Sequence, residues 1–179
     1  MKLGVMQPYF MPYIGYFQLM KAVDKYVVYD DVNYIKGGWV NRNHILINGE
    51  KEMFTVTLKK ASQNKLFNEI VIGDDFKKLM KTLQLNYSKA VNFDQTMTLM
   101  KRIISFSDKR LAAFIANSFR EIFSYLSIDT EILMSSDIPK DKILQICEIL
   151  GADTYYNAIG GQNLYDNPAI SIHMNDDKT

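Results

Sequence analysis

The chain is poor in the residues that mark disulfide scaffolds and metal centres. Its 179 residues include one cysteine and two histidines. One cysteine excludes an intramolecular disulfide framework. His44 and His173 lack the spacing to another histidine or cysteine that a zinc site requires. Cys147 shares a helical face with Ile143 and Leu144, which is typical of a small core residue rather than a nucleophile. We therefore expect no metal site.

An excess of one charge sign and long apolar runs are also missing. Lys and Arg number 21 and Asp and Glu 20, for a formal net charge of +1, which offers no basic footprint for nucleic acid. No stretch approaches the roughly 18 apolar residues of a membrane-spanning helix. The apolar run before Gln7 is too short for a signal peptide. We expect a cytoplasmic protein with a small-molecule substrate, no nucleic-acid partner and no stable insertion in a membrane.

Apolar residues are abundant enough for a folded core, at 47% of the chain. A strand–helix–strand pattern occurs at both ends of the chain, and Asn48-Gly49 between two alternating segments predicts a β-hairpin. We predict an α/β fold with a mainly parallel, Rossmann-like sheet, into which the hairpin and a helical pair are inserted. The expected strands span 3–6, 26–29, 43–47, 52–58, 69–72, 131–134 and 154–157. The expected helices begin at 17 or span 75–87, 94–105, 109–126 and 141–150.

The loop that follows the first apolar run is the most informative segment of the chain. Two prolines and a glycine end the strand, and ligands of open α/β sheets bind at such strand ends. A rigid turn whose aromatic residues plug the core is the alternative. We favour a binding loop, because a glutamine and three tyrosines are polar for a plug. The candidate binding residues are Gln7, Pro8, Tyr9, Pro12 and Gly15, and the candidate catalytic residues are Tyr13 and Tyr16.

Two carboxylates follow the second strand. Asp30 and Asp31 are placed to bind a ribose, a metal or an amine. Aspartate is also favoured where a strand ends in a turn, so both interpretations stay open. No third nearby carboxylate completes a metal cage.

Cations and glycines gather just beyond, in Lys36-Gly37-Gly38-Trp39-Val40-Asn41-Arg42-Asn43. Arginine suits bidentate binding of phosphate or carboxylate, and the single tryptophan suits stacking on a base or a sugar ring. A solvated lead-in to the hairpin is the alternative. Lys36, Trp39 and Asn41 are candidate binding residues, and Arg42 is a further candidate catalytic residue.

The last two strands carry further candidates at their ends. Ser135 and Ser136 follow one strand, where they serve equally well as a helix N-cap region. Gly160, Gly161 and Tyr165 follow the next. Because the carboxyl ends of parallel strands share one edge of the sheet, we expect these residues to face the same pocket as the N-terminal loop.

Three of these blocks, at residues 6–17, 29–43 and 160–165, resemble the WbqC-like protein family in content and in order. The resemblance covers nearly the whole chain and implies a role in bacterial O-antigen (lipopolysaccharide) and polysaccharide gene clusters, for which glycine transfer has been suggested. It also implies that residues 1–179 form a single WbqC-like domain. Because family members usually continue with a further strand, helix and C-terminal segment, we expect this domain to be C-terminally truncated.

A more remote resemblance concerns Pro12-Tyr13-Ile14-Gly15-Tyr16, which is placed like the His-x-Gly-His signature of the nucleotidylyltransferase superfamily. That resemblance implies a nucleotide pocket packed against Gly15. Tyrosines stand at both histidine positions, and a phenol donates a hydrogen bond without the charge of an imidazolium.

Two functions follow from these resemblances. The first is a transferase that acylates an amino sugar, with glycine as the amino acid, through an activated carboxylate and with ATP as the candidate cofactor. The alternative is a non-catalytic module that binds a nucleotide or a nucleotide-sugar for a polysaccharide gene cluster.

Overall fold

The computed structural model describes residues 1–139, 143–158 and 171–175. Within them, the central sheet has five strands in the order β7-β2-β1-β8-β9, and every neighbouring pair runs parallel. The predicted α/β fold with a parallel Rossmann-like sheet is therefore confirmed. The strands are β1 (Lys2–Met6), β2 (Lys25–Val28), β7 (Glu131–Met134), β8 (Thr154–Ala158) and β9 (Ser171–Asn175).

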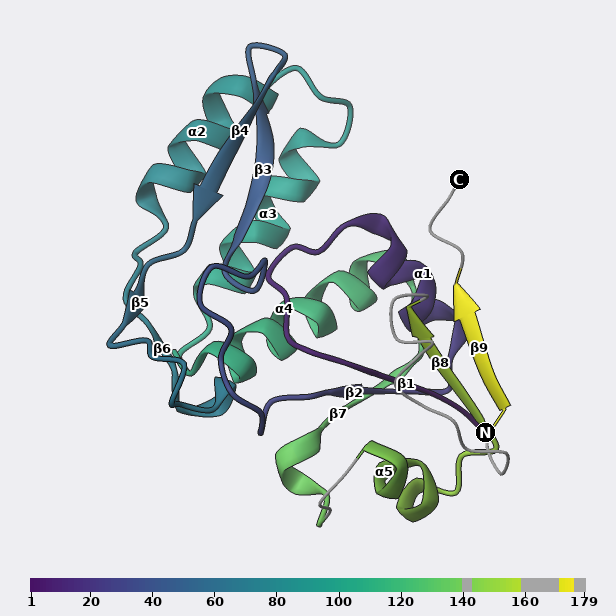
Figure 1. Ribbon diagram of the computed structural model, residues 1–179. Coiled ribbons are helices and arrows are strands. Elements are labelled where there is room, and N and C mark those ends of the chain that lie inside the picture. The colour runs from purple at the N-terminus through teal and green to yellow at the C-terminus, as the bar shows by residue number, and fades with distance from the viewer. Residues whose placement is uncertain (140–142, 159–170, 176–179) are drawn as a thin grey trace.

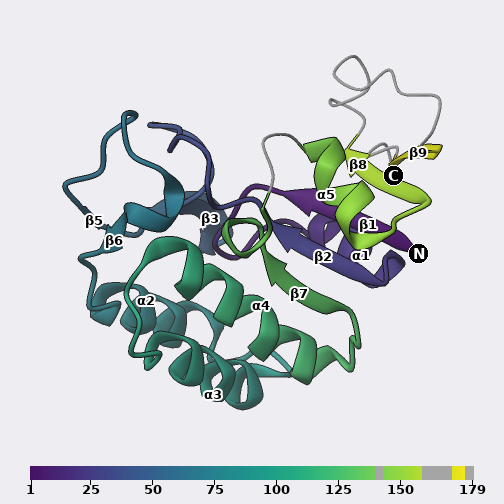
Figure 2. The ribbon, with the colours of Figure 1, turned by 90° about the horizontal axis from the view of Figure 1, so that it is seen from below.

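Helices cover both faces of this sheet (Figures 1 and 2). Helices α1 (Ile14–Ala22) and α4 (Leu111–Leu126) lie on one face and α5 (Ile143–Leu150) lies on the other. The side chains of β2 alternate accordingly. Tyr26 and Val28 pack in the core of α1 and α4, and Val27 packs in the core of α5. Because both faces are buried, the strands read as continuous apolar runs.

The order of the strands reverses next to β1. From β1 the chain builds outward through β2 to β7, then returns along α5 to add β8 and β9 on the opposite side of β1. In open α/β sheets the crevice at such a reversal, outside the carboxyl ends of the strands, is where ligands bind. The fold therefore directs attention to the segment that leaves β1.

The insertion between β2 and β7 contains the predicted hairpin. Strands β3 (Arg42–Ile47) and β4 (Glu50–Thr55) pair antiparallel, and the turn residues Asn48 and Gly49 have φ values of +51° and +84°. Positive φ at both positions is the geometry for which Asn-Gly is selected. The remaining elements of the insertion are β5 (Leu58–Lys59), a 3₁₀ turn (Phe67–Glu69), β6 (Val71–Ile72), α2 (Lys77–Tyr87) and α3 (Phe93–Ile104).

The second helix of the predicted pair has a larger role than expected. Helix α4 packs beside α3, and it also covers the sheet, because the Phe119 ring lies 6.0 Å from Tyr26 and 6.4 Å from Phe17. The reason is topological: β2 and β7 are parallel neighbours, and a parallel pair needs a crossover helix on one face of the sheet.

An aromatic cluster around Phe10 joins the insertion to the sheet. Phe10 follows β1 and is 1% exposed. Its ring centre lies 5.6 Å from Phe114 of α4, 6.0 Å from Phe76 before α2 and 6.5 Å from Phe54 of β4. The loop after β1 is therefore anchored both to α4, which covers the sheet, and to the hairpin and α2 of the insertion.

The two fully buried tyrosines of the sheet provide a test of this packing. The Tyr26 hydroxyl has no hydrogen-bond partner in the described part of the chain, whereas the Tyr155 hydroxyl donates to the Val5 carbonyl at 3.4 Å. A buried unsatisfied donor costs about 1–3 kcal/mol. Tyr26→Phe is therefore expected to raise the free energy of unfolding at pH 7, and Tyr155→Phe to lower it, in denaturant titrations of both variants.

Tyr26 also predicts how the free energy of unfolding changes at alkaline pH. Burial raises the pKa of Tyr26 well above its ordinary value. The unfolded chain then loses this proton first, so stability falls as the pH rises above about 10. Tyr26→Phe should reduce that fall. An unchanged alkaline slope together with a loss of stability at pH 7 would contradict the assignment.

Candidate functional site

Three of the segments that contain predicted site residues lie side by side at the carboxyl edge of the sheet. Strands β7, β2 and β1 are consecutive in the sheet, and they lead into Ser135-Ser136, Asp30-Asp31 and Gln7 respectively. Gly160, Gly161 and Tyr165, which follow β8, lie outside the described residues. The expectation that they share the pocket stays a prediction.

A cluster of tyrosines stands where the loop enters α1. The Tyr16 ring lies 5.4 Å from Tyr9 and 5.6 Å from Tyr13, edge to face in both pairs. Tyr13 is the N-cap residue, and its side chain makes no capping hydrogen bond to the helix. No acidic residue stands in the first turn of α1. The Tyr16 amide donates to the Tyr13 carbonyl at 3.1 Å, and the positive partial charge of the helix start is not offset by a capping side chain of Tyr13 or by an acidic residue of the first turn.

Gly15 allows the Tyr13 ring to lie against the start of the helix. A Cβ atom at position 15 would sit 2.3 Å from Tyr13 Cε2, closer than real contacts allow. Pro8 and Pro12, on either side of Phe10, are buried, while Gln7 is half-buried. The loop is therefore a rigid support that leaves its tyrosines at the rim.

The phenols of this cluster are neutral groups. Burial, with smaller contributions from Tyr13 and Tyr9, raises the pKa of Tyr16 well above its ordinary value. Burial also raises the pKa of Tyr9. At physiological pH both act as hydrogen-bond donors and neither supplies a positive charge or a base.

Hydrogen bonds hold this loop against the segment that precedes the hairpin. The Phe10 amide donates to the Val40 carbonyl at 2.8 Å, and Asn43 Nδ2 donates to the Met11 carbonyl. Two blocks that are distant in sequence, residues 7–16 and 36–43, therefore lie side by side. The positive charge that the tyrosines lack is available from the second block.

Arg42 lies over the Trp39 ring, and the His44 ring lies tilted beside Trp39. Its guanidinium carbon is 5.3 Å from the centre of the Trp39 ring, and the Trp39 and His44 rings are 5.2 Å apart. Trp39 remains 46% exposed. Arg42 Nε is buried, and in the described part of the chain it has neither a hydrogen-bond partner nor an ion pair. Arg42 as a whole is partly exposed, and the Trp39 ring lies against its guanidinium group.

Of the residues near Arg42, Asn41 is buried and supports the hairpin, whereas Lys36 is exposed to solvent. The Asn41 side chain is buried, accepts from the Tyr34 hydroxyl at 3.1 Å and donates to the Val56 carbonyl at 2.7 Å. Those bonds hold the base of the hairpin. Lys36 is exposed on the glycine-containing loop that precedes Arg42. That loop runs close to Arg42, because a Cβ built at Gly37 would lie 3.9 Å from Arg42 Nη2.

Asp30 links the ends of β2 and β7. Its carboxylate accepts from the Ser135 hydroxyl at 3.0 Å and from the Ser136 amide and hydroxyl, each at 2.9 Å. Its own amide donates to Ser135 Oγ at 3.0 Å, and the Ser135 hydroxyl also contacts Asp31. Asp30 is 1% exposed. The network favours the strand-end interpretation of Asp30 and leaves Asp31 nearer the surface.

Two arginines that the sequence analysis did not single out lie beside this network. Arg110 and Arg120, from the start and the middle of α4, line a cavity of about 430 Å³ together with Asp30 and Ser136. Arg110 is tied to Asp108 at 2.6 Å. No sequence signal distinguished Arg120, which stands beside Glu121 in a helix with further polar residues. The edge of the sheet thus carries cations at both flanks.

Within residues 1–139, 143–158 and 171–175, no group of three or more His, Cys, Asp or Glu side chains is arranged to hold a metal ion. No helix of that part of the chain is long and apolar enough to cross a membrane.

Loss of the Asp30 network should cost stability. Hydrogen bonds to a charged group are worth about 1.5–3 kcal/mol, so Asp30→Ala is expected to lower the free energy of unfolding by at least that amount. Asp137→Ala, an exposed carboxylate three residues after β7, is the matched control and should change it little. Urea titration of both variants measures the difference. Equal stability of the two would show that the network does not join the strands.

The chain is similar to known proteins over most of its length. A protein of Mycobacterium tuberculosis, "Uncharacterized protein Rv1507c", is 26% identical over 174 residues, which cover 92% of this chain and 75% of that protein. No solved structure shows a significant match. Residues 7–173, from the loop after β1 into β9, match the WbqC-like protein family. The chain belongs to the WbqC-like protein family.

Proposed function

We propose that this protein is a transferase of bacterial surface-polysaccharide (O-antigen) biosynthesis that acylates an amino sugar with glycine through an activated carboxylate. The observation that supports the proposal is the uncapped start of α1 at the reversal of the strand order, with tyrosine donors at its rim and Arg42 on the adjoining segment. Such a site suits an anionic ligand, and we propose a nucleotide.

Amide formation from a free carboxylate needs a leaving group, which ATP supplies. In the proposed first step the glycine carboxylate attacks the α-phosphorus and pyrophosphate leaves. In the second step the amine of the sugar attacks the activated carbonyl carbon, AMP leaves and the amine loses a proton. Tyr13 and Tyr16 would donate hydrogen bonds to phosphate oxygens, and Arg42 would compensate for the charge that develops on them.

The residues of the site fit an adenylate-forming role in three respects. Gly15 allows the Tyr13 ring, which carries a hydrogen-bond donor, to lie against the start of α1. The guanidinium of Arg42 is desolvated on one side and lacks a competing carboxylate among the described residues. Trp39 is half-exposed and offers an aromatic face for a base or a sugar ring.

A second function is favoured by the state of the tyrosines. Because burial raises the pKa of Tyr9 and Tyr16, these side chains provide neither an imidazolium-like charge nor a base near pH 7. A module that binds a nucleotide-sugar without chemistry needs only donors and a cation, and the site has both. We retain this as the alternative.

ATP–pyrophosphate exchange with a panel of amino acids separates the two functions. The transferase is expected to incorporate labelled pyrophosphate into ATP when glycine is present and not when other amino acids replace it. Nucleotide binding without exchange would favour the binding module. Failure to bind any nucleotide would remove both.

Arg42 provides the sharpest single-residue test of the anion site. One charge-assisted hydrogen bond is worth about 1.5–3 kcal/mol, so Arg42→Ala should weaken nucleotide binding by about tenfold or more, and Arg42→Lys by less. Arg102→Ala is the matched control, because Arg102 pairs with Glu121 at 2.9 Å on the surface between α3 and α4. Calorimetric titration measures all four proteins. Wild-type affinity in Arg42→Ala would exclude Arg42 as the anchor.

A further inference from the structure

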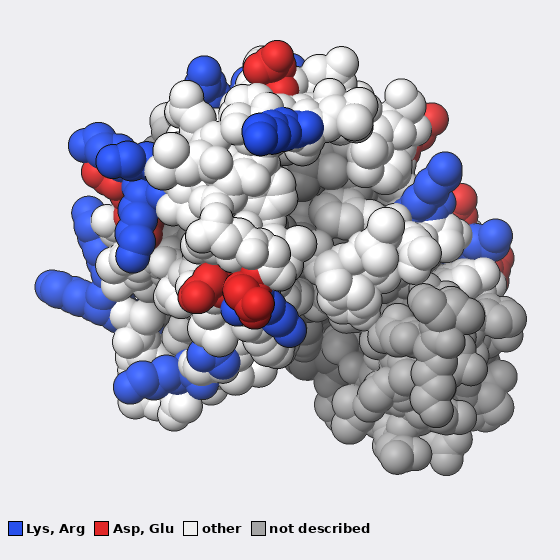
Figure 3. Space-filling model, turned by 90° about the horizontal axis from the view of Figure 1, so that it is seen from above, with Lys and Arg blue, Asp and Glu red and all other residues white. Residues whose placement is uncertain are grey.

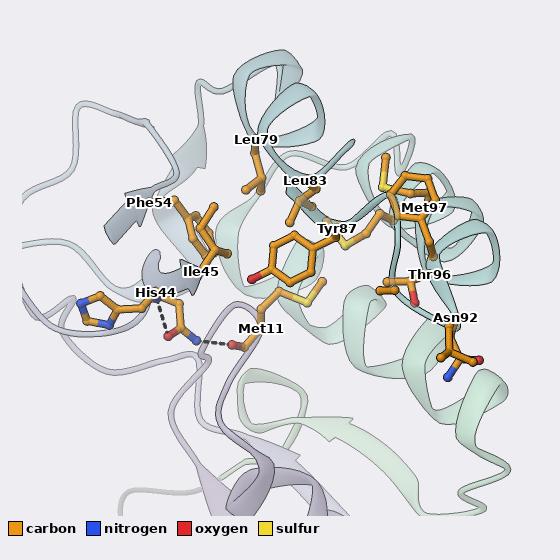
Figure 4. Close-up of a pocket in the computed structure, with 15 residues that line it drawn as sticks. Met11, His44, Ile45, Phe54, Leu79, Leu83, Tyr87, Asn92, Thr96 and Met97 are labelled. Carbon is orange, nitrogen blue, oxygen red and sulfur yellow. Dashed lines mark hydrogen bonds between the residues drawn. The ribbon is translucent and has the colours of Figure 1, made fainter. Parts of the chain in front are cut away.

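An apolar cavity lies inside the insertion, on the other side of the hairpin from Arg42. It is formed between β3 and β4 on one side and α2, α3 and their connection on the other, and Met11 of the loop after β1 closes one end (Figure 4). Its volume is about 450 Å³. Figure 4 shows the His44 ring directed away from this space, which separates the cavity from the Trp39–Arg42 stack.

The lining of the cavity has no charged side chain. Leu79, Leu83, Phe54, Met97 and Met100 are among its apolar members. None of the 11 residues of α2 is fully buried, although the helix has a clear apolar stripe. Leu79 and Leu83 pack against the core on one side and line the cavity on the other, so the stripe is only partly covered by the protein's own side chains.

Two of the polar side chains in the lining, Asn43 and Tyr87, already have hydrogen-bond partners, and the other polar members are His44, Asn92 and Thr96. Asn43 donates to the Met11 carbonyl and accepts from the His44 amide, the latter at 2.7 Å. The Tyr87 hydroxyl accepts from the Leu46 amide at 2.7 Å. Apolar side chains make up most of the lining, so a polar ligand would find few groups there to satisfy its hydrogen bonds. The cavity selects for hydrocarbon.

The flexible residues of the lining indicate the shape of that hydrocarbon. Methionine adapts to irregular and mobile apolar ligands, and three methionines, Met11, Met97 and Met100, line the cavity. The volume of about 450 Å³ is roughly fifteen times the ~30 Å³ of one water molecule. A methylene group has about the volume of one water molecule, so a linear chain of roughly ten to twelve carbons would occupy about two-thirds to four-fifths of this space and leave the remainder to imperfect packing.

The position of Met11 connects the cavity to the edge of the sheet. Met11 has a φ of +50°, a left-handed conformation that is uncommon for methionine, and the Asn43 side chain holds its carbonyl. A chain in the cavity thus ends beside the loop that follows β1. Seen from above, many of the Lys and Arg side chains gather along the left side of the molecule (Figure 3).

We infer that this cavity is a binding site for a linear hydrocarbon chain of an amphipathic ligand. The inference rests on the cavity alone and is independent of the proposed transferase activity. Loss of nucleotide binding in Arg42→Ala leaves it intact, since Arg42 lies on the opposite face of the hairpin.

A series of straight-chain carboxylates from six to fourteen carbons, each below its micellar concentration, tests the site by calorimetry. Each added methylene is expected to raise the affinity roughly fourfold until the cavity is full, near ten to twelve carbons, and the affinity should then stop rising. The matching alcohols should reach the same limit, because the head group makes no required contact.

Two variants of one side chain make the test specific. Leu83→Trp fills the cavity and should abolish binding of the ten-carbon chain, whereas Leu85→Trp, on the same helix but 71% exposed and outside the lining, should not. Leu83→Ala enlarges the cavity and should move the limit to longer chains. Circular dichroism checks that each variant is folded. Affinity that rises without limit in wild type, or a limit unchanged by Leu83→Ala, would overturn the proposal.

Discussion

The packing of Phe10 is the constraint on which the rest of the molecule depends. This one ring, fully buried between α4, the residue before α2 and β4, lies in the first loop of the chain. It requires the loop to leave β1 toward the insertion rather than to turn directly into α1. Residues 7–13 are consequently held beside the base of the hairpin, and the hydrogen bonds to Val40 and from Asn43 complete that arrangement.

That arrangement explains why a polar loop and a cationic segment meet although one belongs to the sheet and the other to an insertion. Parallel strands place their carboxyl ends on one edge, and the reversal of strand order next to β1 leaves a crevice there. The cluster of Tyr9, Tyr13 and Tyr16 lies beside this crevice, where the loop after β1 enters α1. The Asp30 network closes the neighbouring strand ends on the other, so that the edge is rigid where β2 meets β7.

The chemistry available at the edge is that of hydrogen-bond donors and cations. Burial raises the pKa of Tyr16 and keeps its phenol neutral, and Arg42 stands on the adjoining segment with a desolvated nitrogen. Such groups stabilise negative charge and do not move protons near pH 7. The apolar cavity behind β3 has the opposite character, and Met11 belongs to both regions. A ligand with an anionic portion and a hydrocarbon portion would use the two surfaces of one loop.

The sequence by itself determined the local elements. Apolar runs with proline, glycine or aspartate at their ends marked the strands, Asn48-Gly49 marked the hairpin, and helical spacing of phenylalanines marked α4, because these signals depend on neighbouring residues. Only the tertiary structure decided what those elements contact. The buried role of Asp30, the cavity of α2 and the placing of Arg110 and Arg120 depend on residues far apart in the chain. Periodicity reports which face of a helix is apolar, but it does not report whether that face is filled.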